Sequence, residues 1–135
     1  NSFQAVANLT SNEKSVDNQI ILLGGAVQCH PQTQGDLVIH EIQRYHVDFC
    51  VLSPVGISPF HGATSFYIEE ANIAREMIKH SHQSIILADQ SKLNVVSRVQ
   101  YAKPTDISML ITTADPNSAA HEEDFRSNFE TILFA

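Results

Sequence analysis

Basic residues are scarce in this chain, and long apolar runs are missing. Its 135 residues include 8 lysines and arginines against 15 aspartates and glutamates, which gives a net charge of −7. That charge repels a polyanion at long range, so nothing in the chain suggests a nucleic-acid surface. No stretch approaches the ~20 apolar residues that span a bilayer, and no basic-then-apolar secretory signal is present. We therefore expect a cytoplasmic location and no membrane segment.

Cysteine and the common catalytic motifs are equally sparse. The two cysteines, Cys29 and Cys50, form no Cys-x-x-Cys pair, and the 7 histidines lack the spacing of a metal site. The sequence also has no Gly-x-Ser-x-Gly elbow, no P-loop and no Gly-x-Gly-x-x-Gly loop. We expect reduced thiols, no metal, no cofactor and no catalytic residue.

What the chain does have is an alternation of short apolar runs with amphipathic stretches, without repeats or low-complexity linkers. This alternation predicts an α/β fold with a largely parallel sheet flanked by helices, in one domain over residues 1–135. Strands are expected at Gln19–Leu23, Asp48–Ser53, Ser84–Ala88 and Ile107–Thr112, and in addition at Arg98–Tyr101 and Thr131–Phe134.

Four helices are expected between these strands. Ser2 is a suitable N-cap for a helix over Phe3–Thr10, and Asp36 for a second helix with Leu37, Ile39 and Ile42 facing inward. The third helix, Phe66–His80, places Ile73, Met77 and Ile78 on its apolar side, and a charged fourth helix covers Ser118–Asn128.

Glycines mark one candidate binding region. Gly24 and Gly25 follow the first predicted strand, and Gly35 precedes the second helix. Backbone N–H groups at such positions can approach an anion without a Cβ in the way. The alternative is that Gly24 and Gly25 only form a tight turn.

A second candidate region follows the strand Ser84–Ala88. Asp89, Ser91 and Lys92 stand at its carboxyl end, where open α/β sheets bind their ligands. Lys92 is suited to neutralise a phosphate. The alternative is a solvated lysine beside an aspartate that caps the turn.

Two further segments are expected at the same edge of the sheet. The segment Ser53–Ser58 begins at the last residue of the predicted strand Asp48–Ser53, and His61–Ser65 leads into the third helix. Thr64 and Ser65 are also good N-cap residues, which alone would explain them. Glu69 and Glu70 in the first helical turn are explained by the helix dipole better than by catalysis.

Taken in order, these fragments resemble the C-terminal domain of DeoR-family transcriptional regulators over nearly the whole chain. The most specific match is Glu69-Glu70-Ala71 with Arg75–Ile78, followed by Ala88-Asp89-Gln90-Ser91-Lys92. Other matching pieces are Asn1-Ser2, Ile20–Gly25, Gly35, Asp48–Gly56, Gly62 and Thr112-Thr113.

The resemblance implies a fold similar to that of ribose-5-phosphate isomerase and the coenzyme A transferases, used as a sensor of phosphorylated sugars. It also implies a DNA-binding winged helix-turn-helix domain and a first strand with an Asp-x-Gly-Thr-Thr-like loop, both before residue 1, and a homodimer or homotetramer. The ligand-binding positions that it implies are Asn1, Gly24, Gly25, Gly35, Gly56, Glu70, Asp89 and Lys92.

The chain departs from the family pattern in two places. Ser53-Pro54-Val55-Gly56 replaces a Gly-Ala-Asp-Gly-like turn, and Cys29-His30-Pro31 replaces a stretch that often carries arginine. Two other functions therefore remain open. One is a sugar-phosphate isomerase or deaminase of the same fold, although Pro54, Gly56 and Ser58 stand where its acidic residues would be. The other is an oligomerisation domain with a degenerate pocket.

Overall fold

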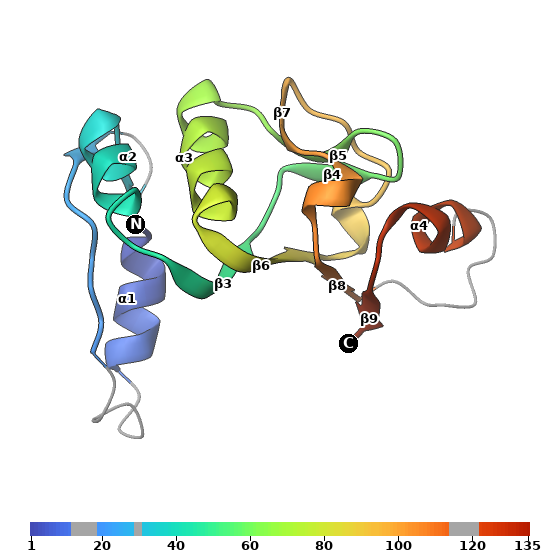
Figure 1. Ribbon diagram of the computed structural model, residues 1–135, viewed down its shortest axis with the longest axis horizontal. Coiled ribbons are helices and arrows are strands. Elements are labelled where there is room, and N and C mark those ends of the chain that lie inside the picture. Colours follow the sequence, from blue (N-terminus) through green and yellow to red (C-terminus); the bar gives the residue numbers. More distant parts are fainter. Residues whose placement is uncertain (12–18, 29–30, 114–121) are drawn as a thin grey trace. The chain divides into compact units, whose positions relative to one another are not determined.

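The computed structural model describes residues 1–11, 19–28, 31–113 and 122–135. It divides the chain into two compact units, Asn1–Tyr45 and His46–Ala135, each of which is described by itself. Figure 1 shows the order of the elements along the chain. Among the described residues, no helix is long and apolar enough to cross a bilayer. The single domain over residues 1–135 stays a prediction.

The first unit contains two helices and a pair of two-residue strands. Helix α1 (Phe3–Thr10) begins where Ser2 Oγ accepts a hydrogen bond of 3.2 Å from the Ala5 N–H, as the sequence predicts. Strands β1 (Ala26–Val27) and β2 (Thr33–Gln34) pair in antiparallel fashion. Helix α2 (Asp36–Ile42) follows, with Gly35 as its N-cap in place of the predicted Asp36.

One further prediction in this unit is wrong, and another is wrong in part. Gln19–Leu23 is not a strand, and Ile21 and Leu22 are exposed. A short apolar run favours burial but does not by itself supply a partner strand. In α2, Ile42 is buried as predicted and Ile39 is half-buried, but Val38 is buried in place of Leu37, which is 68% exposed. Val38 lies four residues before Ile42 and therefore shares its helix face, whereas Leu37 lies five residues before it.

The second unit is built on a four-stranded parallel sheet, which confirms the predicted α/β class. Its order is β3-β6-β8-β9, and each strand pairs in parallel with the next. The strands are β3 (Val47–Leu52), β6 (Ser81–Ala88), β8 (Met109–Thr112) and β9 (Ile132–Phe134). The chain thus adds each new strand at the same side of the sheet. Because all four strands are parallel, their carboxyl ends meet at one edge.

Helices α3 (Ile68–Lys79) and α4 (Glu122–Asn128) contribute to one hydrophobic core with this sheet. Ala71 and Ala74 of α3 and Phe125 of α4 are buried in the same cluster as Ile86 and Leu110 of the strands. Ile73 is buried as expected, while Met77 and Ile78 are half-buried. The predicted start of α4, residues 118–121, lies outside the described part of the chain.

The opposite face of the same sheet is apolar and exposed. Phe49 and Val51 of β3 are 58% and 52% exposed, and Leu87 and Leu133 are also exposed. Because side chains alternate along a strand, these residues point away from the core formed with α3 and α4.

A small antiparallel sheet completes the second unit, and of its strands the sequence predicted only the one at Arg98–Tyr101. Its order is β4-β5-β7, with β4 (Gly56–Ser58), β5 (Gly62–Ser65) and β7 (Val99–Ala102). Thr64 and Ser65 belong to β5, so their predicted role as N-caps of α3 is wrong, and Tyr67 takes that position. Two short 3-10 helices, η2 (Gln90–Lys92) and η3 (Pro104–Asp106), flank β7 along the chain.

Candidate functional site

The carboxyl edge of the parallel sheet contains a hollow of about 260 Å³. The residues directly after the four strands, Ser53, Asp89, Thr113 and Ala135, all line it. Lys92, Leu87, Ala88, Ile111 and Thr112 complete the lining. We call this hollow the edge pocket. Its polar groups are one ammonium, one carboxylate and the hydroxyls of Ser53, Thr112 and Thr113.

Lys92 is the only cation of the edge pocket among the described residues. Its Nζ donates a hydrogen bond of 2.7 Å to Ser53 Oγ, which joins the turn after β6 to the turn after β3. An ammonium carries three donors, so this bond leaves others for a ligand. Lys92 is therefore held at the pocket by a partner that does not neutralise its charge.

Asp89 shapes the turn that carries Lys92. Its Oδ1 accepts hydrogen bonds from the Ser91 N–H at 2.8 Å and from the Ser91 Oγ at 2.5 Å, and it caps η2. These two bonds, with the nearby charge of Lys92, hold the pKa of the Asp89 carboxyl below its usual value. Asp89 is thus ionised at neutral pH, and its Oδ1 is used to cap η2.

The turn after β6 is also joined to the turn after β8. The Gln90 N–H donates a hydrogen bond of 3.3 Å to Thr113 Oγ1. Together with the bond between Lys92 and Ser53, this places hydroxyls from two neighbouring turns beside the Lys92 turn. The edge pocket can therefore offer one positive charge and several hydroxyl groups to a polar anion, beside the Asp89 carboxylate that is bonded to Ser91.

Gly56 and Glu70 lie in the same unit but do not line the edge pocket. Gly56 is packed against the segment after η2, where an added Cβ would lie 2.3 Å from the Val95 carbonyl oxygen. Glu70 Oε2 accepts a hydrogen bond of 2.8 Å from Ser65 Oγ and is half-buried. Both therefore have a structural role at the junction of β4, β5 and α3.

The other predicted positions belong to the first unit. Asn1 Nδ2 donates a hydrogen bond of 2.9 Å to the Thr33 carbonyl oxygen. Gly24 is exposed, and Gly25 faces Val38 and Gln34 so closely that a Cβ would not fit. Gly35 has φ +92°, a left-handed conformation that favours glycine. The premise that Gly24 and Gly25 directly follow a buried strand is wrong, because residues 19–23 form none.

Sequence reasoning placed Ser53 at this edge of the sheet but did not include Ser53, Thr112 or Thr113 among the ligand-binding positions. A signal was available, because each comes at the end of a predicted strand and carboxyl ends of parallel strands share one edge. Among the described residues, no group of three or more histidine, cysteine, aspartate or glutamate side chains is placed to hold a metal ion. Cys29 and His30 lie outside the described residues.

Comparison with known proteins agrees with this geometry. The family described as the DeoR C terminal sensor domain matches residues 1–114. The transcriptional repressor GlcR of Bacillus subtilis is 39% identical over 129 residues, which are 95% of this chain and 49% of GlcR. The transcriptional regulator GolR of Listeria innocua is 30% identical over 105 residues, covering 77% of this chain and 41% of GolR.

A third relative is the glycerol-3-phosphate regulon repressor of Haemophilus influenzae, which is 26% identical over 106 residues, 78% of this chain and 41% of that protein. The chain thus spans half or less of the length of these curated relatives. Because the family match covers most of the chain, including β3, β6, β8 and the Lys92 turn, the chain belongs to the family of DeoR C-terminal sensor domains.

Proposed function

We propose that this sensor domain binds a phosphorylated sugar or a related phosphorylated metabolite in the edge pocket and releases it unchanged. One observation carries the proposal: the residues that follow all four parallel strands line one hollow, with Lys92 as its cation. A phosphate monoester fits this arrangement, because its charge pairs with the ammonium and its sugar hydroxyls pair with Ser53 and Thr113. That one relative is named for glycerol 3-phosphate is consistent with such a ligand.

The wider function that we propose is control of transcription. The relatives are named as HTH-type transcriptional repressors and regulators, so a DNA-binding part on the same polypeptide would respond to the ligand. The net charge of −7 assigns DNA contacts to that part and not to this chain. We also propose a cytoplasmic location and a homodimer or homotetramer, and sedimentation velocity would measure the latter.

Catalysis by an isomerase or a deaminase is the competing function, and Asp89 is the carboxylate that would have to act as its base. A general base works best when its pKa lies near the operating pH. The hydrogen bonds from Ser91 lower the pKa of Asp89 instead. This carboxylate is therefore poorly suited to proton abstraction, which supports binding without conversion.

A thermal-shift screen of triose, pentose and hexose phosphates tests the proposal. A ligand at a hundredfold excess over its Kd stabilises the folded state by about 2.7 kcal/mol. For a domain of this size, that raises Tm by on the order of 10 °C. Lys92→Ala should lose most of the shift, because a hydrogen bond to a charged group contributes about 1.5–3 kcal/mol.

Arg44→Ala is the matched control. Arg44 is an exposed cation of the first unit whose ion pair with Glu41 measures 2.9 Å, so the variant removes one positive charge from a residue that does not line the edge pocket. It should respond like the parent. An equal response of Lys92→Ala and the parent would show that the phosphate is not bound by Lys92, and product formation detected by NMR would establish an enzyme.

A further inference from the structure

A second and larger hollow, of about 510 Å³, lies beside α3 in the same unit. Its lining comes from the second half of α3, from β7 and from the residues around η3. Three of the chain's 8 basic residues, Arg75, Lys79 and Lys103, line it, and Asp106 is the one acidic residue in the lining. Three cations against one carboxylate is an excess of positive charge in a chain whose net charge is −7. We call this hollow the α3 pocket.

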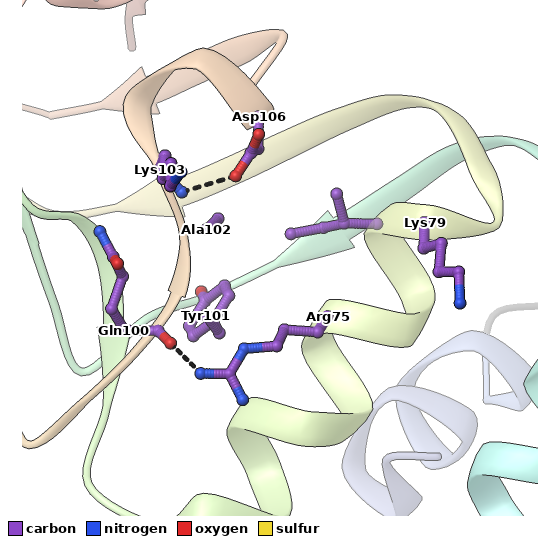
Figure 2. Close-up of a pocket in the computed structure, with 8 residues that line it drawn as sticks. Arg75, Lys79, Gln100, Tyr101, Ala102, Lys103 and Asp106 are labelled. Carbon is purple, nitrogen blue, oxygen red and sulfur yellow. Dashed lines mark hydrogen bonds between the residues drawn. The ribbon is translucent and has the colours of Figure 1, made fainter.

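Arg75 is held in position without a carboxylate partner. Figure 2 shows its side chain extending from α3 toward β7, where Nη2 donates to the Gln100 carbonyl oxygen. Nη1 donates a second hydrogen bond, of 2.9 Å, to Asn72 Oδ1. Both acceptors are neutral, and a guanidinium carries five donors. Arg75 therefore keeps its charge and further N–H groups for a ligand, in an orientation already fixed by the protein.

The two other cations differ from each other. Lys79 is paired with Glu76 at 3.6 Å, and Figure 2 shows its side chain extending away from Gln100 and Lys103. Lys103 makes no ion pair with any described residue. The Asp106 carboxylate accepts a hydrogen bond of 2.9 Å from the Lys103 backbone N–H, and not from its side chain. The one carboxylate of the lining, that of Asp106, is thus already used in capping η3.

Apart from Gln100, the rest of the lining is largely apolar. Tyr101 and Ala102 are 8% and 1% exposed, and Ile78 of α3 is half-buried. A ligand that combines an anionic group with an apolar body would contact both the charged and the apolar parts of the lining. Free phosphate would contact only the charged part.

The α3 pocket is separate from the edge pocket. Lys79 precedes the first residue of β6, Ser81, and Asp106 precedes the first residue of β8, Met109. These lining residues therefore mark the amino-terminal edge of the parallel sheet, whereas the edge pocket lies at its carboxyl ends. The two hollows share no residue.

We propose that the α3 pocket is a second binding site, which takes a small phosphate monoester with an apolar body between Arg75 and Lys103. The two cations come from different elements, so they can contact a doubly charged group from two directions, and the arginine supplies the planar fork that suits phosphate oxygens. The proposed second site shares no residue with the proposed effector site, so each proposal can be tested without the other.

Phenyl phosphate and inorganic phosphate are the probes, each titrated into the ¹⁵N-labelled chain at constant ionic strength. Phenyl phosphate should shift the backbone amide signals of Gln100–Lys103, Thr105 and Asp106 in a saturable way, and it should bind several-fold more tightly than inorganic phosphate. Lys103→Gln keeps the backbone N–H that caps η3 and should weaken binding about tenfold. Arg75→Lys, which keeps the charge but loses the fork, should also weaken it.

Two controls make the test decisive. Arg44→Gln removes one exposed charge in the first unit, and Lys92→Ala alters the edge pocket. Both should bind phenyl phosphate at the α3 pocket with the parental Kd. The proposal is overturned if Lys92→Ala abolishes the shifts, if Lys103→Gln and Arg44→Gln behave alike, or if the shifts spread over the surface without saturating.

Discussion

Lys92 and Ser53, 39 residues apart in the sequence, are joined by a hydrogen bond of 2.7 Å between Nζ and Oγ. The bond connects the turn after β6 to the turn after β3, which are neighbours because these strands pair in parallel. It fixes the ammonium over the edge pocket without cancelling its charge. The position of the one cation in the proposed effector site thus depends on a neutral hydroxyl in the next turn.

Ser53→Ala is expected to weaken effector binding while leaving the fold intact. The variant removes an exposed hydroxyl, so Tm without ligand should stay within about 1 °C of the parent, since surface changes of this kind alter stability little. Lys92 then loses its positioning partner, and the pocket loses one donor to the sugar. A neutral hydrogen bond contributes about 0.5–1.5 kcal/mol, which predicts a Kd raised roughly two- to tenfold.

Isothermal titration calorimetry with the sugar phosphate selected by the screen would measure this change. Ser91→Ala is a useful comparison, because it removes the Ser91 hydroxyl that bonds to Asp89 rather than to Lys92. An unchanged Kd in Ser53→Ala would show that the lysine needs no such support.

Gly56 and Gly24 were both predicted as ligand positions, and the structure gives them opposite tolerance to a side chain. A Cβ on Gly56 would lie 2.3 Å from the Val95 carbonyl oxygen, whereas a Cβ on Gly24 would meet nothing within 4 Å. Gly56→Ala should therefore destabilise the fold by about 1–3 kcal/mol through overpacking. Gly24→Ala should be close to neutral. Chemical denaturation of the two variants would compare them directly, and equal midpoints would contradict the packing described for Gly56.

The parts of the fold that local pattern determines were predicted well. The helix Phe3–Thr10 was predicted with its N-cap, and the predicted strand Asp48–Ser53 differs from β3 by one residue. The hairpin of β4 and β5 was missed because its strands are short and contain glycine. A signal was present, since Gly62 directly follows a three-residue connection and has φ +61°, a conformation that favours glycine.

The candidate site was predictable only in part, for a related reason. Asp89 and Lys92 line the edge pocket as expected, because their position follows from the strand directly before them. Gly56 and Glu70 do not, because their surroundings are set by Val95 and Ser65, which no local pattern reveals. The ligand contacts of all these residues stay predictions.

Cys50 should resist thiol reagents in the folded protein. It is 3% exposed, its burial raises the pKa of the thiol, and it accepts a hydrogen bond of 3.3 Å from Ser81 Oγ. Because the thiolate is the reactive form, the low exposure and the raised pKa both slow the reaction of this thiol at neutral pH. In a Cys29→Ser background, Ellman's reagent should label less than a tenth as fast as in guanidinium chloride. Rapid stoichiometric labelling of the native protein would contradict the burial of Cys50.

Tyr101 has a buried hydroxyl without a hydrogen-bond partner among the described residues, and this predicts a stabilising substitution. An unsatisfied buried polar group typically costs about 1–3 kcal/mol, so Tyr101→Phe should be neutral or stabilising by about 1 kcal/mol at pH 7. Burial, together with the nearby Cys50 and Glu70, also raises the pKa of the Tyr101 hydroxyl far above its usual value. The unfolded chain therefore releases this proton at a lower pH than the folded chain does.

The sign of the pH effect follows from that difference. Between the unfolded pKa of about 10 and the higher folded value, the folded state holds one more proton, so the stability of the parent falls as pH rises. Tyr101→Phe lacks this loss, and its advantage over the parent should grow between about pH 10 and 11. Denaturation curves of both proteins across this range, with Tyr45→Phe as the exposed control, would measure it. A constant difference between parent and variant would show that Tyr101 ionises as freely in the folded protein as in the unfolded chain.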